Sequence, residues 1–154
     1  MFDTLAVITY LLGRDPKDID RLHLKASFPD KPPVTCVQNA PSPQIKWQKV
    51  SPDASSLALI VKDSSHYEWV VYNLPIDARG LPFDANAEIN PNDVGINSWG
   101  QKNYHSPCVG NTKYPVTVEL FVLDKRFSAR NKMTGEMLEK KIKDHVMEKA
   151  IVRE

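Results

Sequence analysis

The sequence predicts a mostly β protein, a β-sandwich with a C-terminal helix and a short N-terminal segment. Two runs of strand length are rich in β-branched and aromatic residues, 56–61 (Ser-Leu-Ala-Leu-Ile-Val) and 69–74 (Trp-Val-Val-Tyr-Asn-Leu). The chain has 12 prolines against 6 glycines, which favours extended, kinked connections between short strands over a helical bundle. Clear helical periodicity is confined to one segment near the C-terminus.

Several segments alternate or stay apolar over the length of a strand. In residues 44–47, Ile45 and Trp47 fall on one face. The continuous apolar run 56–61 predicts a central strand covered on both faces. Residues 77–100 are rich in Asn, Asp, Pro and Gly, which indicates a long irregular loop. We therefore expect strands at 22–28, 34–37, 44–47, 56–61, 69–74 and 116–124.

The C-terminal helix is expected to begin at Thr134, whose hydroxyl suits an N-cap, with Glu136 favourably placed in the first turn. Apolar residues recur every four positions and predict a buried stripe of Leu138, Ile142, Val146 and Ala150. Charged residues, Glu139 and Glu148 among them, would form the solvent-facing side. His145 is expected on the same helix as a hydrogen-bonded structural residue.

Length and charge bound the possible functions. With 154 residues the chain fits one domain, which we place at 22–154, preceded by a segment 1–21 packed on it. The net charge of +1 creates no long-range field for nucleic acid. No stretch approaches the roughly 18–20 apolar residues of a transmembrane helix. The apolar N-terminus leaves a trimmed export signal as an alternative.

The two cysteines, Cys36 and Cys108, lie in no metal-binding spacing. Either they are buried free thiols, or they form one disulfide, which would imply an oxidising compartment. The first alternative favours a cytoplasmic protein and the second a periplasmic one.

No enzyme signature is complete in the sequence, so we expect no enzyme, no cofactor and no metal. His66 and Glu68 with Cys108 resemble part of a zinc deaminase pattern, but Asn111 occupies the place of the required second cysteine. A thiol hydrolase using Cys108 with His105 or His66 stays as an alternative, although nothing in the sequence places an activating charge beside the thiol.

Several motifs in a fixed order resemble the phosphatidylethanolamine-binding family, including its bacterial Raf-kinase-inhibitor-like members. They are residues 42–47 (Ser-Pro-Gln-Ile-Lys-Trp), 56–61, 69–75 (Trp-Val-Val-Tyr-Asn-Leu-Pro), 97–100 (Asn-Ser-Trp-Gly) through 104–108 (Tyr-His-Ser-Pro-Cys), 113–114 (Lys-Tyr), 120–124 (Leu-Phe-Val-Leu-Asp) and 144–147 (Asp-His-Val-Met). The resemblance implies a β-sandwich with a small surface pocket for phosphate-like anions. It also raises a Cys36–Cys108 disulfide as an option, because cysteines often occur together in the matching segments of bacterial relatives.

Carried onto this chain residue by residue, the family pocket gives the candidate ligand-binding residues Asp63, Glu68, His105, Ser106, Pro107, Thr112 and Tyr114. Glu68 and Thr112 stand where the family has histidines. His66 and Glu68 lie two apart and should share one strand face, either as a polar pair at the pocket mouth or as two solvated loop residues.

Two carboxylates, Asp63 and Glu68, would then face a docking anion. Like charges a few ångströms apart cost on the order of 1–4 kcal/mol. We therefore expect phosphate or head-group binding to be weakened or lost, unless His66 or His105 supplies a cation. The leading hypothesis is a non-enzymatic binding or regulatory protein that engages a small anion or modulates a protein partner such as a kinase or protease. The alternative is an interaction protein with a disused pocket.

Overall fold

Strand β3 (Ser56–Lys62) lies inside the larger of two antiparallel sheets, between β4 (Tyr67–Leu74) and β6 (Thr117–Leu123). The computed structural model describes residues 21–28, 40–107, 116–129 and 132–153. The larger sheet has the order β4-β3-β6-β7, with β7 spanning Val146–Arg153. The smaller sheet has the order β1-β2-β5, formed by His23–Ser27, Gln44–Gln48 and Gly80–Leu81.

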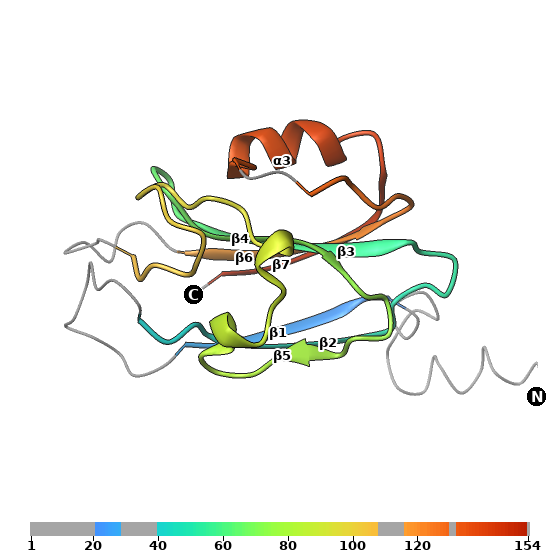
Figure 1. The fold of residues 1–154 in the computed structure, drawn as a ribbon. Helices are drawn as coiled ribbons and strands as arrows, with labels where there is room; N and C mark the ends of the chain where they lie inside the picture. Colours follow the sequence, from blue (N-terminus) through green and yellow to red (C-terminus); the bar gives the residue numbers. More distant parts are fainter. Residues whose placement is uncertain (1–20, 29–39, 108–115, 130–131, 154) are drawn as a thin grey trace, which may run out of the picture.

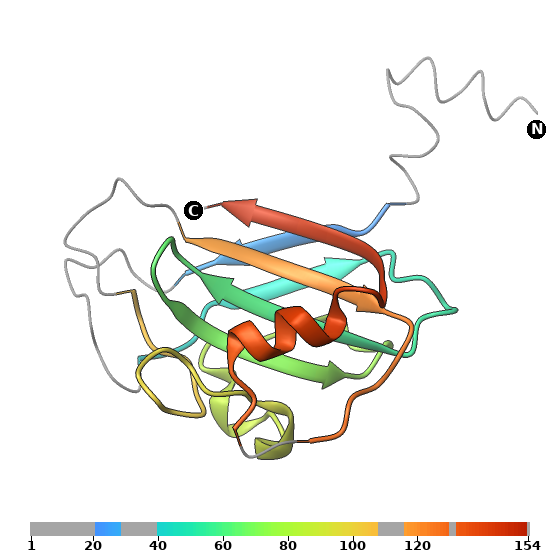
Figure 2. The same ribbon diagram turned by 90° about the horizontal axis from the view of Figure 1, so that it is seen from above.

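The two sheets stack as layers, and helix α3 (Gly135–Ile142) covers the outer face of the larger sheet (Figure 1). Seen from above, α3 lies across the strands of that sheet (Figure 2). Two short 3-10 helices, η1 (Ala85–Ala87) and η2 (Pro91–Asp93), interrupt the connection that follows β5. The predicted mostly β sandwich with a C-terminal helix is confirmed.

Strand β3 is apolar along residues 57–61 because both of its faces pack against buried clusters. Its alternate residues Leu57, Leu59 and Val61 belong to the core between the sheets, together with Trp47 from β2. Ala58 and Ile60 belong to a second cluster beneath α3. All of these β3 side chains are fully buried, because both faces of the strand are covered. The prediction for residues 56–61 is confirmed.

The other described strands match their predictions with one omission. β1, β2, β4 and β6 fall within or beside the predicted segments, and Ile45 and Trp47 share the buried face of β2. The predicted irregular loop 77–100 contains the two-residue strand β5 and both 3-10 helices, which its composition did not indicate. The predicted strand 34–37 lies outside the described residues, as do residues 1–20 of the N-terminal segment.

The predicted C-terminal helix is too long. Thr134 caps it as expected, its hydroxyl accepting a hydrogen bond from the N–H of Met137 at 3.1 Å. The helix ends at Ile142, and Val146 and Ala150 belong to β7 instead. A spacing of four residues places side chains on one side of a helix and also of a strand, so the stripe did not distinguish them. Pairing along the whole of β6 decides for the strand.

Two further predictions for this region are corrected by the same change. His145 lies in the turn after α3, not on the helix, although it is hydrogen-bonded through Nδ1 to Asp124 Oδ1 at 2.9 Å. Glu148 is a β7 residue whose carboxylate accepts the main-chain N–H of Leu22 at 2.9 Å.

Among the described residues, no helix has the length and apolarity needed to span a bilayer.

Candidate functional site

A β-bulge at the start of β4 positions Glu68. Val61 of β3 pairs with Trp69, whereas the next residue, Lys62, pairs with Tyr67, so Glu68 is an extra residue without a partner on β3. Bulges of this kind redirect side chains and often border binding sites. Tyr67 packs toward α3, and Glu68 is completely buried at 0% exposure. The alternative that Glu68 is a solvated loop residue is therefore wrong.

The turn between β3 and β4 presents Asp63 and His66 beside Glu68. The Asp63 carboxylate accepts the N–H groups of Ser65 at 2.7 Å and His66 at 2.8 Å, which fixes its position. His66 Nδ1 lies 3.6 Å from Asp63 Oδ1. One oxygen or nitrogen from each of Asp63, His66 and Glu68 lies within 4.8 Å of the other two. The predicted polar pair of His66 and Glu68 therefore meets, with Asp63 as a third member.

The two carboxyl groups of this cluster hold unlike charges. Burial, followed by the contact with Asp63, raises the pKa of Glu68 to about 10, so Glu68 is protonated at neutral pH. Burial alone would raise the pKa of Asp63, but hydrogen bonds from Glu68, Ser65 and His66 outweigh it and lower that pKa. Among the described residues, the carboxyl oxygens of Glu68 have no hydrogen-bond partner other than Asp63 and the main chain of Glu68 itself. The pair therefore carries one negative charge, not the two expected from the sequence.

The loop 97–105 covers the free edge of β4 beside this cluster. Its main chain joins β4 through Ser98 N–H to the Tyr67 carbonyl at 2.9 Å and His105 N–H to the Glu68 carbonyl at 3.0 Å. The side chain of Asn97 accepts the N–H groups of Trp99 and Gln101 at 2.9 and 3.1 Å. This turn holds the indole of Trp99 in place over the site.

Three rings stack at the site in the order His66, Trp99, His105. The His66 and Trp99 centroids are 4.9 Å apart, and those of Trp99 and His105 are 3.7 Å apart with an interplanar angle of 6°. His105 is buried, and its Nδ1–H donates to the Ser106 carbonyl at 2.6 Å. His105 is thus held by stacking and by the main chain.

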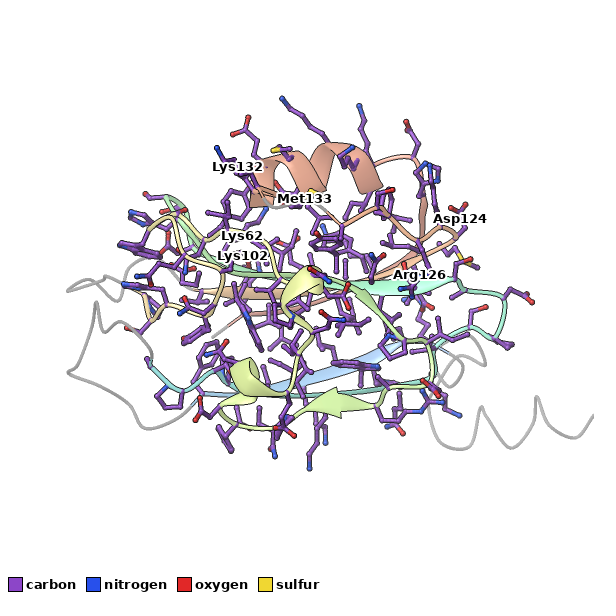
Figure 3. The ribbon with its side chains drawn as sticks, viewed as in Figure 1. Lys62, Lys102, Asp124, Arg126, Lys132 and Met133 are labelled. Carbon is purple, nitrogen blue, oxygen red and sulfur yellow. The ribbon has the colours of Figure 1, made fainter. Side chains whose placement is uncertain are left out.

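The nearest lysine in the sequence is turned away from the cluster. Lys62 Nζ lies 2.5 Å from Glu139 of α3 and 3.7 Å from Glu119 of β6, so its charge is neutralised on the helix side of the sheet. Figure 3 shows Lys62 and Lys102 on one side of the molecule and Asp124 and Arg126 toward the opposite side. A surface hollow on the Lys62 side is lined by residues 62–67.

The predicted site is therefore only partly assembled from described residues. The structure brings together Asp63, Glu68 and His105, the last through its main chain, and places Ser106 and Pro107 next in the chain, half-buried. Thr112, Tyr114, Cys36 and Cys108 lie outside the described residues. Trp99 is absent from the predicted site residues, although its loop belongs to a segment that resembles the family's pocket loop. Its local sequence does not show that this loop folds back onto the β3–β4 turn.

Comparison with known proteins agrees with this fold. The family model for phosphatidylethanolamine-binding proteins matches residues 20–153. The chain belongs to this family. A UPF0098 protein from Chlamydia pneumoniae is 30% identical over 135 residues, 81% of this chain and 87% of the relative. A UPF0098 protein from Methanothermobacter thermautotrophicus is 32% identical over 98 residues, 58% of this chain, and the match spans 65% of that relative.

Solved structures of family members have the same fold. A phosphatidylethanolamine-binding protein homolog from Chlamydia trachomatis superposes with a TM-score of 0.73 at 25% identity, covering 87% of this chain and 95% of its own. Escherichia coli YbcL, described as a member of the mammalian family, gives a TM-score of 0.72 at 17% identity, covering 86% and 94%. The second likeness is one of fold alone.

Proposed function

We propose that this protein is a non-enzymatic binding protein of the phosphatidylethanolamine-binding family whose pocket has little affinity for phosphate-like anions. The observation that carries the proposal is the contact between the buried carboxyl of Glu68 and the Asp63 carboxylate. Phosphate sites depend on positive charge or on converging N–H donors. Here Asp63 already takes up the N–H groups of Ser65 and His66, so an anion would meet a negative charge.

The neighbouring imidazoles support the same conclusion. His66 lies against Asp63, so any positive charge on its ring is shared with that carboxylate, and His105 directs its Nδ1–H to a main-chain carbonyl. Under this proposal, any regulatory effect on a kinase or protease is exerted through the surface around the pocket and does not require a bound anion.

The test is calorimetric titration of metal-free protein with phosphate and with phosphoethanolamine. We expect no micromolar affinity in the wild-type protein. Glu68→His, which puts the family's imidazole into the bulge, should gain affinity by at least tenfold at a pH of about 6, where an ordinary imidazole is largely protonated. Micromolar phosphate binding by the wild-type protein would contradict the proposal.

A further inference from the structure

We propose that Asp63, His66 and Glu68 form a binding site for a divalent first-row transition-metal ion such as Zn²⁺. The inference concerns the pocket of the proposed function and names a cation as the ligand that this pocket accepts. Three observations carry it: the donor set, the convergence of the donor atoms, and the unpartnered carboxyl oxygens of Glu68.

The donor set is one imidazole and two carboxyl groups. Zn²⁺ is bound in proteins by His nitrogen and Asp or Glu oxygen, and sites with three protein ligands keep a fourth position for water or another ligand. Imidazole nitrogen selects transition metals over Mg²⁺ and Ca²⁺, which prefer oxygen alone. The composition of the cluster therefore points to a transition-metal ion with one open position.

The donor atoms already converge. All three lie within 4.8 Å of one another, and the Asp63 Oδ1 to His66 Nδ1 separation is 3.6 Å. A point equidistant from three atoms at the largest of these separations lies about 2.8 Å from each, so shifts of several tenths of an ångström would give the roughly 2.0–2.2 Å bonds of Zn²⁺. His66 can make such a shift, because its side chain is 40% exposed.

Glu68 supplies the observation that points to a ligand. Its side chain is fully buried, and both oxygens lack any hydrogen-bond partner outside the cluster among the described residues. Within the described part of the chain, its carboxyl group contacts only the cluster itself, and a cation bound there would displace the proton that Glu68 shares with Asp63 and release it to solvent. The β-bulge directs this carboxyl toward Asp63, where a cation between the two would satisfy both.

The neighbouring loop keeps His66 oriented. Its ring stacks on Trp99, which Asn97 holds through the N–H of that residue. A metal ligand held in one ring orientation loses less freedom on binding than a free surface histidine. The same stack makes Trp99 a fluorescent reporter of an ion at His66.

The experiment uses the full, tag-free chain after removal of metal by a chelator. Titration with ZnCl₂ should give one ion per chain, and Co²⁺ should give visible absorption bands and quench Trp99 emission. Loss of a supporting partner of a metal ligand commonly costs 10–100-fold in affinity, so Asp63→Asn, His66→Asn and Glu68→Gln should each weaken binding at least about tenfold. Thermal melting curves check that each variant folds.

The matched control is His145→Asn. His145 also lies beside a carboxylate, Asp124 at 2.9 Å, but the described residues supply no third ligand there. This variant should bind Zn²⁺ as the wild-type protein does. The inference is overturned by absence of Zn²⁺ binding, by binding that survives all three site substitutions, or by equal affinity for Mg²⁺. Phosphate binding in metal-free protein is a separate measurement, so the failure of this inference and of the proposed function can be told apart.

Discussion

The carboxyl group of Glu68 is completely buried against the carboxylate of Asp63, at the point where a β-bulge interrupts the pairing of β3 and β4. Two acidic residues in contact are stable in this position because one of them keeps its proton. The proton on Glu68 should make the free energy of unfolding depend on pH, and the packing around the pair should make that free energy sensitive to substitution.

The first prediction concerns pH and Glu68. Its pKa is about 10 in the folded protein against an ordinary value of 4.5, so the folded state binds the extra proton between these values. The stability from this proton is complete below the unfolded pKa and falls as pH rises, by up to about 1.4 kcal/mol per pH unit. Denaturant unfolding from pH 5 to 9 should show a steeper loss in the wild-type protein than in Glu68→Gln.

Glu136→Gln is the control for this prediction. Glu136 is an exposed helix residue, with 74% of its side chain accessible. Its substitution should leave the pH dependence of unfolding unchanged. Parallel curves for the wild-type protein and Glu68→Gln would show that Glu68 is not protonated in the folded state.

The second prediction concerns the close approach of α3 to β4. A Cβ added at Gly135 would lie 2.2 Å from Cδ1 of Tyr67. Gly135→Ala should therefore displace the Tyr67 ring and its hydrogen bond to Glu139, at a cost of about 1–3 kcal/mol in unfolding free energy. In a Tyr67→Ala background the same substitution should cost much less. Equal costs in both backgrounds would refute the steric explanation.

The third prediction concerns Asn73 in the second irregularity of β4. Its φ is +56°, and its side chain donates to the Phe127 carbonyl at 2.5 Å and accepts the Phe127 N–H at 2.8 Å. Asn73→Ala loses both bonds and strains the backbone, which together should cost about 2–4 kcal/mol. Asn73→Gly loses only the bonds and should be less destabilised in urea unfolding. The reverse order would show that the backbone conformation is not strained.

The fourth prediction concerns the fluorescence of Trp99, the tryptophan at the site. Trp47 and Trp69 are 3% and 0% exposed, whereas Trp99 is half-buried in the histidine stack. Acrylamide should therefore quench mainly Trp99, and Trp99→Phe should leave emission that resists quenching and is shifted to shorter wavelength. Unchanged quenching in Trp99→Phe would mean that the buried core admits the quencher.

The class of fold and most of its strands follow from the residue pattern alone. The apolar run of β3 requires cover on both faces, and the ordered motifs identify the family, because each of these signals is local to a few residues. Thr134 likewise fixes the start of α3 through its own hydroxyl. The residue at which α3 ends could not be predicted from local sequence, because a spacing of four residues suits helix and strand alike. It depends on β6, which pairs with β7.

The chemistry of the site depends instead on contacts made in the folded chain. The sequence placed Glu68 beside Asp63 as a second negative charge, whereas burial in the bulge keeps Glu68 neutral. It gave no sign that Trp99, some thirty residues away, stacks on His66. Charge state depends on solvation and neighbours, and neighbours depend on chain closure, so neither can be read from residue types alone.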